Sequence, residues 1–196
     1  MKKRLRLPRP ERLQQILAAA WELFSTRPYD EVSTSEVAKR ASVSEGLLYH
    51  YFPRKRDLFI AVLRSQLENF QLVVYGDPHL PVQKRIHQGL ETTLALIETY
   101  PTLAQVVLRG GLGADQEIYD LLNEYRRIRK ANVFSLLETQ HPTPLFDLAI
   151  DGWISFFDQV CLRWIEKHDI SREHVIYLLE QNLQWLWTLS SSEEKS

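Results

Sequence analysis

The stretch from Ser33 to Lys55 holds the residues whose types and spacing could act together in binding. One short predicted helix there carries a carboxyl group at Glu45, an imidazole at His50 and hydroxyl groups at Tyr49 and Tyr51, with Gly46 and Leu47 between them. Leu48 and Phe52 lie four residues apart on one face of that helix and are expected to be buried, which leaves the other residues to face outward. Such a helix can enter the major groove of DNA, where these groups bind phosphates and base edges.

Two short helices and a tight turn must position these side chains. Ser33 and Glu36 form a capping box for a first helix that carries Val37 and ends at Ala41. After a four-residue turn, Ser44 caps the second helix. The spacing is that of a helix-turn-helix, whose second helix reads DNA.

A helix on each side is expected to support this unit. The first runs from Pro10 to about Ser25, with an apolar stripe at Leu13, Ile16, Leu17, Ala20 and Phe24. The connector at residues 26–33 interrupts this helix, because Pro28 forces the chain out of α geometry, and Tyr29 can pack back beneath the helix. A long helix over about residues 54–74 follows, with Leu58, Val62, Leu67, Phe70 and Val74 facing inward.

Residues 10 to 60 resemble the N-terminal domain of the tetracycline-repressor (TetR) family. The resemblance combines many positions at fixed spacing over three helices, so it is far more specific than a short motif. These positions are Ile16, Leu17, Ala18, Ala19, Ala20, Leu23, Phe24, Tyr29, Thr34, Val37, Ala38, Ala41, Val43, Ser44, Gly46, Leu48, Tyr49, Tyr51, Phe52, Lys55 and Leu58.

The resemblance implies a DNA contact for eight residues. Bases would be approached by Glu45, Gly46 and Leu47, and phosphates would be held by Thr34, Tyr49, His50, Tyr51 and Lys55. Ser35 and Ser44 complete the expected DNA-binding set. It also implies a homodimer on a palindromic operator, repression in the empty state, and release when a small ligand tilts the long helix that begins near Arg54.

Three positions depart from the family pattern. Pro28 precedes Tyr29 where relatives usually have glycine, so this connector must take a different path. Ser42 occupies the turn where glycine is usual, so either Ser42 is strained or the turn is altered. Glu45 begins the reading helix, where its carboxylate either interacts with the helix dipole or accepts from a cytosine amino group.

Positive charge is concentrated near the N-terminus. The first 60 residues contain 12 Lys and Arg against 7 Asp and Glu, a net charge of +5, while the rest contain 12 against 18, a net of −6. Phosphate binding needs local positive charge. The net negative charge of the rest of the chain disfavours contact between its surface and the DNA. The basic residues from Lys2 to Arg6 are either a solvated tail or further phosphate contacts.

The remainder of the chain reads as helices, expected at about residues 82–99, 102–109, 115–138, 145–167 and 171–189. No strand pattern occurs, so we expect an all-α protein of about nine helices: a helix-turn-helix domain at 1–53, a ligand-binding and dimerisation domain at 54–190, and a disordered tail at 191–196. The glycines at 110–113 follow no strand and predict a loop, not a phosphate cradle. The charge run 124–130 is expected to be a solvated helix face.

The last two helices predict self-association. Residues 145–167 are apolar nearly all round, which suggests burial against the protein's own core on one side and a second subunit on the other. Two helices from each subunit would form a four-helix bundle. The interface residues we expect are Leu148, Gly152, Phe156, Ile176, Leu179, Leu183 and Leu186.

A surplus of apolar and aromatic residues in the second domain suggests a cavity for a small, largely apolar effector. Its wall is expected to include Phe70, Leu94, Tyr125, Trp153 and Phe157, with Arg109 or His87 meeting a polar end. Each of these aromatic and apolar residues could equally be ordinary core, and His87 and Arg109 could lie on the surface.

Other chemistry lacks support. The six histidines include no pair three or four residues apart, Cys161 stands alone, and no nucleophile motif occurs, so we expect no metal, no cofactor and no enzyme. Asp147 and Asp151 share a helix face, as carboxylates often do by chance.

No apolar run approaches the roughly 20 residues that cross a bilayer, and no secretory signal opens the chain, so we expect a cytoplasmic protein without membrane contact. A ligand-independent DNA-binding protein, or an enzyme on the same fold, remain the alternatives.

Overall fold

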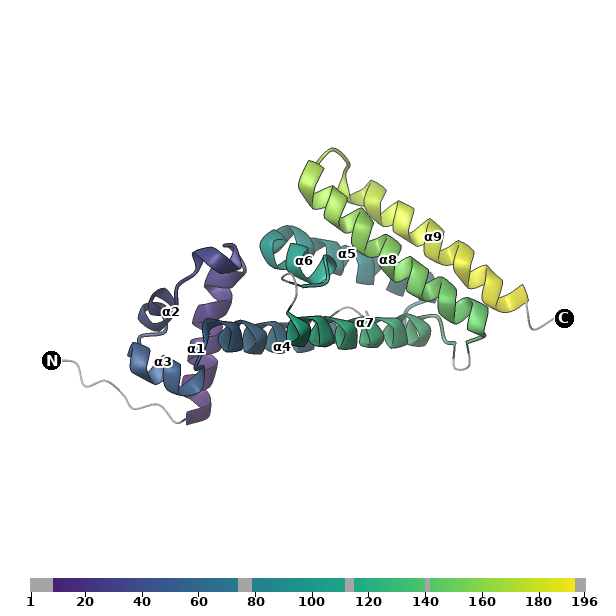
Figure 1. The fold of residues 1–196 in the computed structure, drawn as a ribbon. Helices are drawn as coiled ribbons and strands as arrows, with labels where there is room; N and C mark the ends of the chain where they lie inside the picture. Colours follow the sequence, from purple (N-terminus) through teal and green to yellow (C-terminus); the bar gives the residue numbers. More distant parts are fainter. Residues whose placement is uncertain (1–8, 74–78, 112–114, 140–141, 193–196) are drawn as a thin grey trace. The chain divides into compact units, whose positions relative to one another are not determined.

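The computed structural model describes residues 9–73, 79–111, 115–139 and 142–192. Within these ranges the chain forms nine α-helices, one 3₁₀ helix and no strand (Figure 1). The expected all-α fold is therefore confirmed.

The chain divides into two compact units, Met1–Gln66 and Leu67–Ser196. The first unit contains α1 (Arg9–Phe24), the 3₁₀ helix η1 (Tyr29–Glu31), α2 (Thr34–Arg40), α3 (Glu45–Tyr51) and the beginning of α4 (Lys55–Val73). Its core consists of apolar side chains from all four α-helices, among them Ile16, Ala20, Phe24, Val37, Leu48, Leu58 and Phe59.

The division between the units falls inside α4, later than the boundary expected after residue 53. Phe59 accounts for the difference, because its ring packs edge-on against Phe24 and Tyr29, with centroids 5.0 and 4.9 Å away. Such aromatic contacts hold the first turns of α4 to the first unit. Tyr29 also packs beneath α1 as expected, stacked on Phe24.

The second unit contains the end of α4 together with α5 (Val82–Thr99), α6 (Pro101–Leu108), α7 (Gln116–Leu136), α8 (Pro144–Lys167) and α9 (Arg172–Ser192). Its helices end where the sequence places breakers. Pro101 opens α6, and Gly110 and Gly111 follow it with φ of 83° and 122°, conformations that glycine adopts without strain. The loop expected in this region is confirmed for its described residues.

α8 and α9 lie side by side along the second unit (Figure 1). The indole N–H of Trp153 on α8 donates to the carbonyl of Leu179 on α9 over 3.4 Å, and Trp164 donates to Ile170 over 2.9 Å in the connection. α9 continues to Ser192, so the expected tail starts two residues too early, and residues 193–196 lie outside the described chain.

Candidate nucleic-acid interface and effector cavity

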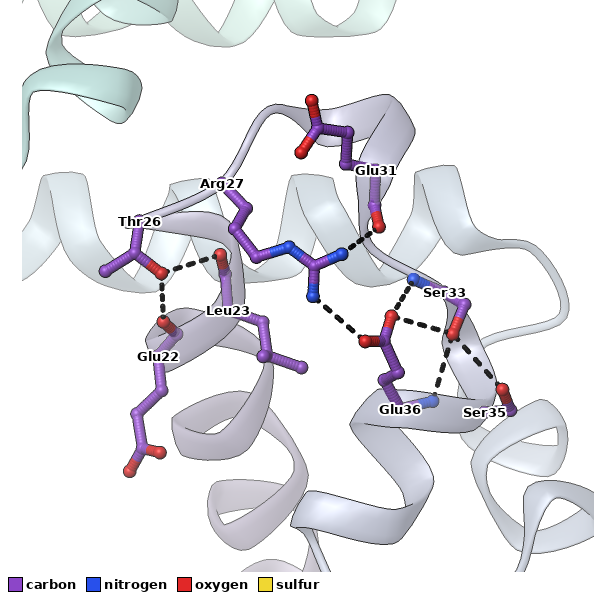
Figure 2. Close-up of polar contacts among 8 residues, drawn as sticks. All are labelled: Glu22, Leu23, Thr26, Arg27, Glu31, Ser33, Ser35 and Glu36. Carbon is purple, nitrogen blue, oxygen red and sulfur yellow. Dashed lines mark hydrogen bonds and ion pairs between the residues drawn. The ribbon is translucent and has the colours of Figure 1, made fainter.

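Serine caps fix the beginnings of α2 and α3. The Ser33 hydroxyl accepts from the Glu36 N–H over 3.1 Å, and the Glu36 carboxylate accepts from the Ser33 N–H over 3.0 Å (Figure 2). The Ser44 hydroxyl accepts from the Leu47 N–H over 3.2 Å. Both caps predicted from the sequence are confirmed, and they set where each helix starts.

Arg27 ties the connector before α2 to the capping box. Its guanidinium forms an ion pair with Glu36 at 2.9 Å and donates to the backbone carbonyl of Glu31 (Figure 2). Hydrogen bonds from the Ser33 backbone, Arg27 and the Ser33 hydroxyl lower the pKa of Glu36 to about 2. No local sequence pattern predicts this role of Arg27, since its partner Glu36 lies nine residues away.

Ser42 holds the turn between α2 and α3 in a left-handed conformation, with φ of 53°. Its N–H donates to the carbonyl of Lys39 over 3.1 Å, and the next N–H, of Val43, donates to Ala38 over 3.0 Å. These bonds close the end of α2 as glycine would. Of the two alternatives for Ser42, the structure favours the strained residue, because its φ lies in the left-handed region.

α3 is anchored by Leu48, which is fully buried, and by Phe52 just after the helix. The opposite face is solvent-accessible, as the spacing predicted. Glu45, Gly46, Tyr49 and His50 are exposed, and Leu47 and Tyr51 are half-buried. A Cβ on Gly46 would meet no atom within 4 Å, so packing within the chain does not require glycine there. Glycine at this site leaves room for close approach by an external partner.

Two hydroxyl groups meet between α2 and α3. Thr34 Oγ1 and Tyr49 Oη are 2.9 Å apart and share one hydrogen bond. Thr34 begins α2 and Tyr49 lies on the exposed face of α3, so this bond fixes the tyrosine relative to the neighbouring helix. Ser35 is exposed beside them, with its hydroxyl 3.1 Å from that of Ser33.

The beginning of α4 places a cation beside the turn of η1. The Lys55 ammonium lies 4.3 Å from the centre of the Tyr29 ring, a cation–π contact that positions the lysine at the helix N-terminus. Asp57 accepts from the Arg54 N–H over 3.2 Å and from its guanidinium over 2.7 Å. The hydrogen bond from Arg54 is the main cause that lowers the pKa of Asp57.

A cavity lies in the second unit and encloses about 590 Å³ between side chains, its open mouth included. α5, α6 and α7 supply most of its wall, and α4 and α8 supply one residue each. The lining residues are Leu67, Thr93, Leu96, Ile97, Tyr100, Leu103, Ala104, Val107, Leu108, Tyr125, Arg129 and Phe157.

Only some of the residues expected at the effector site line this cavity. Tyr125 and Phe157 do, whereas Leu94 and Trp153 are buried in the core. Two further candidates lie outside the cavity on the exposed surface: His87 Nδ1 is 2.8 Å from a carboxylate oxygen of Glu180, and Arg109 forms an ion pair with Glu166 at 2.6 Å. Phe70 lies in α4, but its side chain is outside the described part of the structure.

Ten of the twelve lining residues were not expected at the effector site, and among these Arg129 is the charged one. The charge run 124–130 was expected to be solvated, but the side chains of Arg129 and Lys130 are only 18% and 17% exposed. Arg129 pairs with Asp158 of α8, while Lys130 pairs with Asp147 and Asp151 at 2.7 and 2.8 Å. A run of charged residues in the sequence does not indicate which of them pack against a neighbouring helix.

The expected dimer residues separate into two groups. Leu148, Gly152 and Phe156 lie on the accessible side of α8. The four residues expected on α9, which are Ile176, Leu179, Leu183 and Leu186, are buried in the protein's own core. They are therefore unavailable to a second subunit in this structure. The exposed apolar residues of α9 are Tyr177, Leu178 and Trp185 on its other face.

The described ranges contain neither a cluster of metal-ligating side chains nor a helix suited to span a membrane. They contain no group of three or more His, Cys, Asp or Glu side chains that could hold a metal ion. None of their helices has the length and apolar character needed to cross a membrane.

Comparisons with known proteins cover both units. Residues 16–62 match a family described as bacterial regulatory proteins of the tetR family. The transcriptional activator FasR of Mycolicibacterium smegmatis is 45% identical over 64 residues, 33% of this chain and 29% of that protein. The nucleoid occlusion factor SlmA of Shewanella baltica is 28% identical over 137 residues, 68% of this chain and 65% of that protein. The matches thus span less than two thirds of either relative.

The fold as a whole is similar to a solved structure. A tetR-family transcriptional regulator from Streptomyces coelicolor superposes with a TM-score of 0.86 and 26% sequence identity, over 95% of this chain and 85% of that one. The similarity therefore extends well beyond the first 62 residues.

Proposed function

Because this chain belongs to the TetR family of transcriptional regulators, we propose that it is a ligand-responsive regulator that binds a palindromic operator as a homodimer. The observation that carries this proposal is the geometry of α3. Leu48 buries one face in the first unit, and the hydrogen bond between Thr34 and Tyr49 holds the polar face in place. Such a helix can be docked in a major groove without rearrangement.

At the operator, Glu45, Gly46 and Leu47 at the beginning of α3 approach the bases. The remaining residues bind the phosphates on both sides of the groove, and these are Thr34, Ser35, Ser44, Tyr49, His50, Tyr51 and Lys55. Hydroxyl, imidazole and ammonium groups are the usual phosphate ligands of such proteins. A protein with this role acts beside the chromosome, in the bacterial cytoplasm.

The second subunit covers the outer face of the last two helices. Leu145, Leu148, Gly152 and Phe156 on α8, and Tyr177, Leu178 and Trp185 on α9, form an accessible face that we call the α8–α9 face. Leu148 is 67% exposed and Trp185 is 60% exposed in the single chain, which leaves much apolar surface in water. Pairing two such faces around a twofold axis removes it.

The effector binds in the cavity of the second unit and releases the protein from DNA. Leu67 of α4 lines the cavity, and the same helix begins with Lys55. An effector that moves α4 therefore changes the spacing of the two α3 helices in the dimer. The empty protein is the operator-bound form, so it acts as a repressor.

Binding to genomic fragments tests the proposal. The purified protein is titrated against a library of fragments at several salt concentrations, and the retained sequences are determined. We expect a palindromic site, with an affinity that falls steeply with salt, since each phosphate neutralised adds about 0.9 to the slope of log affinity against log salt. Equal binding at low and high salt, or no bound fragment, would contradict DNA binding.

A ligand-independent DNA-binding protein is the second candidate, because the relative in Shewanella baltica is named for nucleoid occlusion and not for a response to a small molecule. Native mass spectrometry of the protein purified from its host separates the two. A small molecule that travels with the dimer and dissociates on denaturation supports the regulator. An empty cavity, together with DNA affinity that no host extract alters, supports the alternative.

A further inference from the structure

The cavity of the second unit is apolar over most of its wall. Leu67, Leu96, Leu103 and Val107 are among the residues that contribute hydrocarbon surface from three different helices. Most of an occupant's body must therefore be apolar.

Arg129 is the one charged residue among those that line the cavity. Its guanidinium lies against the rings of Phe157 and Tyr125, 4.9 and 5.8 Å from their centroids. It donates one hydrogen bond, from Nη1 to Asp158 Oδ1 over 2.7 Å. A guanidinium has five N–H donors, and this one makes no further hydrogen bond to a described residue. Several strong donors thus remain available beside apolar walls.

The charges around Arg129 do not balance. Asp158 is only 2% exposed, and its Oδ2 has no hydrogen bond in the described structure. Arg126 lies 3.6 Å from that oxygen, so two guanidinium groups surround one carboxylate. The cluster carries one excess positive charge; the Arg126 side chain is 42% exposed to solvent, whereas the Arg129 side chain is only 18% exposed and lines the cavity. A single negative charge on an occupant would neutralise it, whereas a cation would be repelled.

Tyr125 offers a second donor at the same end of the cavity. Its hydroxyl makes no hydrogen bond to any described residue, although the side chain is largely enclosed. Burial raises the pKa of Tyr125, so the hydroxyl stays protonated at neutral pH and can donate.

From these contacts we infer that the effector is an organic monocarboxylate with an apolar body. Arg129 and Tyr125 receive its carboxylate, and the α5 and α6 side chains enclose the body. This inference names the chemical class of the ligand that the cavity binds. It rests on the proposed function only in treating that ligand as the effector. A planar carboxylate matches the guanidinium fork, and its single charge matches the single excess charge.

Calorimetry with matched probes tests the inference on the full-length protein without DNA. Octanoate, octanol and octylamine share the apolar body and differ only in the head group. We expect octanoate to bind at least about tenfold more tightly than octanol, since hydrogen bonds to charged groups exceed neutral ones. Octylamine should not bind. Equal affinities for octanoate and octanol would overturn the inference.

Variants separate a ligand contact from a structural role. Tyr125→Phe should weaken octanoate binding about fivefold, the worth of one hydrogen bond, without lowering thermal stability, because the removed hydroxyl has no partner in the described chain. Arg109→Gln is the matched control, since Arg109 lies in an exposed ion pair outside the cavity, and should leave octanoate affinity unchanged.

Arg129→Met alone leaves Asp158 buried without its closest cation and can prevent folding. The double variant Arg129→Met with Asp158→Leu removes both charges together. It should fold, bind octanol as the unmodified protein does, and lose its preference for octanoate. Retention of that preference would contradict the inference.

The outcomes also distinguish this inference from the proposed function. If the protein binds its operator but none of the three probes, the carboxylate inference is wrong while DNA binding stands. If octanoate binds with the expected preference but leaves operator affinity unchanged, the cavity chemistry is supported and the effector role is contradicted.

Discussion

Single side chains decide how well the DNA-reading turn is held. Ser42 has φ of 53°, a left-handed conformation that disfavours residues with a Cβ. Thr34 and Tyr49 share a hydrogen bond across two helices, and Lys55 rests on the Tyr29 ring. Each of these two contacts restricts the side chain of a residue proposed to contact DNA. That side chain therefore loses little conformational freedom when the duplex binds.

Ser42→Gly should stabilise the first unit, because glycine adopts this φ without strain. The greater freedom of glycine in the unfolded chain offsets part of the gain, so we expect an increase in the free energy of unfolding of about 0.5 kcal/mol. Chemical denaturation measures it. The same exchange at Ser35, inside α2, should lower stability instead, since glycine disfavours helix. A loss of stability at Ser42 would contradict the strain.

Lys55→Ala should weaken DNA binding by a similar factor on operator and unrelated sequences, since the ammonium is proposed to contact a phosphate. The slope of log affinity against log salt should become shallower by about one unit. Anisotropy titrations at several salt concentrations measure both. Lys84→Ala removes the same charge from an exposed site on α5 and should leave binding unaltered. A loss confined to the operator would instead assign Lys55 to base recognition.

The helices of the first unit depend on how their ends are closed. α2 has only seven residues, too few to be stable in isolation, so its capping box and the Arg27 ion pair matter more than in a long helix. Glu36 takes part in both. The charged form of its carboxylate is therefore tied to the folding of the helix-turn-helix.

The pKa of Glu36 predicts a loss of stability in acid. Its folded value is about 2, below the ordinary value of 4.5, so its contribution is complete above pH 4.5 and is lost as the pH falls towards 2. Glu36→Gln keeps the capping geometry but removes the charge. The variant should lose less stability than the unmodified protein between these pH values, as measured by denaturant midpoints. Parallel pH profiles for the two proteins would contradict the assignment.

α7 illustrates how one helix face serves two purposes. Lys130 joins α7 to Asp147 and Asp151 of α8, and Arg129, one residue earlier, reaches Asp158 and the cavity. These partly buried pairs align α7 with α8. The carboxylates at Asp147 and Asp151, which looked like a chance pairing in the sequence, are a binding site for a lysine.

The complete regulator is proposed to be a dimer, because a single chain exposes the α8–α9 face to water. Reading a palindrome also requires two α3 helices related by a twofold axis. In the proposed dimer, an effector bound in one subunit can change the spacing between its α3 and the α3 of the second subunit.

Trp185→Ala should weaken the dimer by about 2 kcal/mol or more, as expected for a central aromatic anchor. Light scattering and sedimentation over a range of concentrations measure the dissociation constant. Tyr119→Ala is the control, because Tyr119 is a similarly exposed aromatic residue on α7, outside the α8–α9 face. If the unmodified protein is monomeric at micromolar concentration, or if both variants behave alike, the proposed interface is wrong.

Most local structure of this protein can be predicted from its sequence. The capping box at Ser33, the cap at Ser44 and the breaks at Pro101 and the glycines after α6 are all present as expected. These features depend on residues within about four positions of one another, so their physical chemistry is contained in the local sequence. The buried and exposed faces of α3 follow from helical periodicity in the same way.

The tertiary structure decided which apolar face of α9 turns inward and which charges of α7 are covered. Periodicity places Ile176, Leu179 and Leu183 on one face and Trp185 on another, but both faces are apolar, and only the packing of α8 chooses between them. Arg129 likewise acquires its role from Asp158, a residue 29 positions away on another helix. Contacts between distant segments depend on how helices assemble, and a single sequence records the local preferences of each helix without recording that assembly.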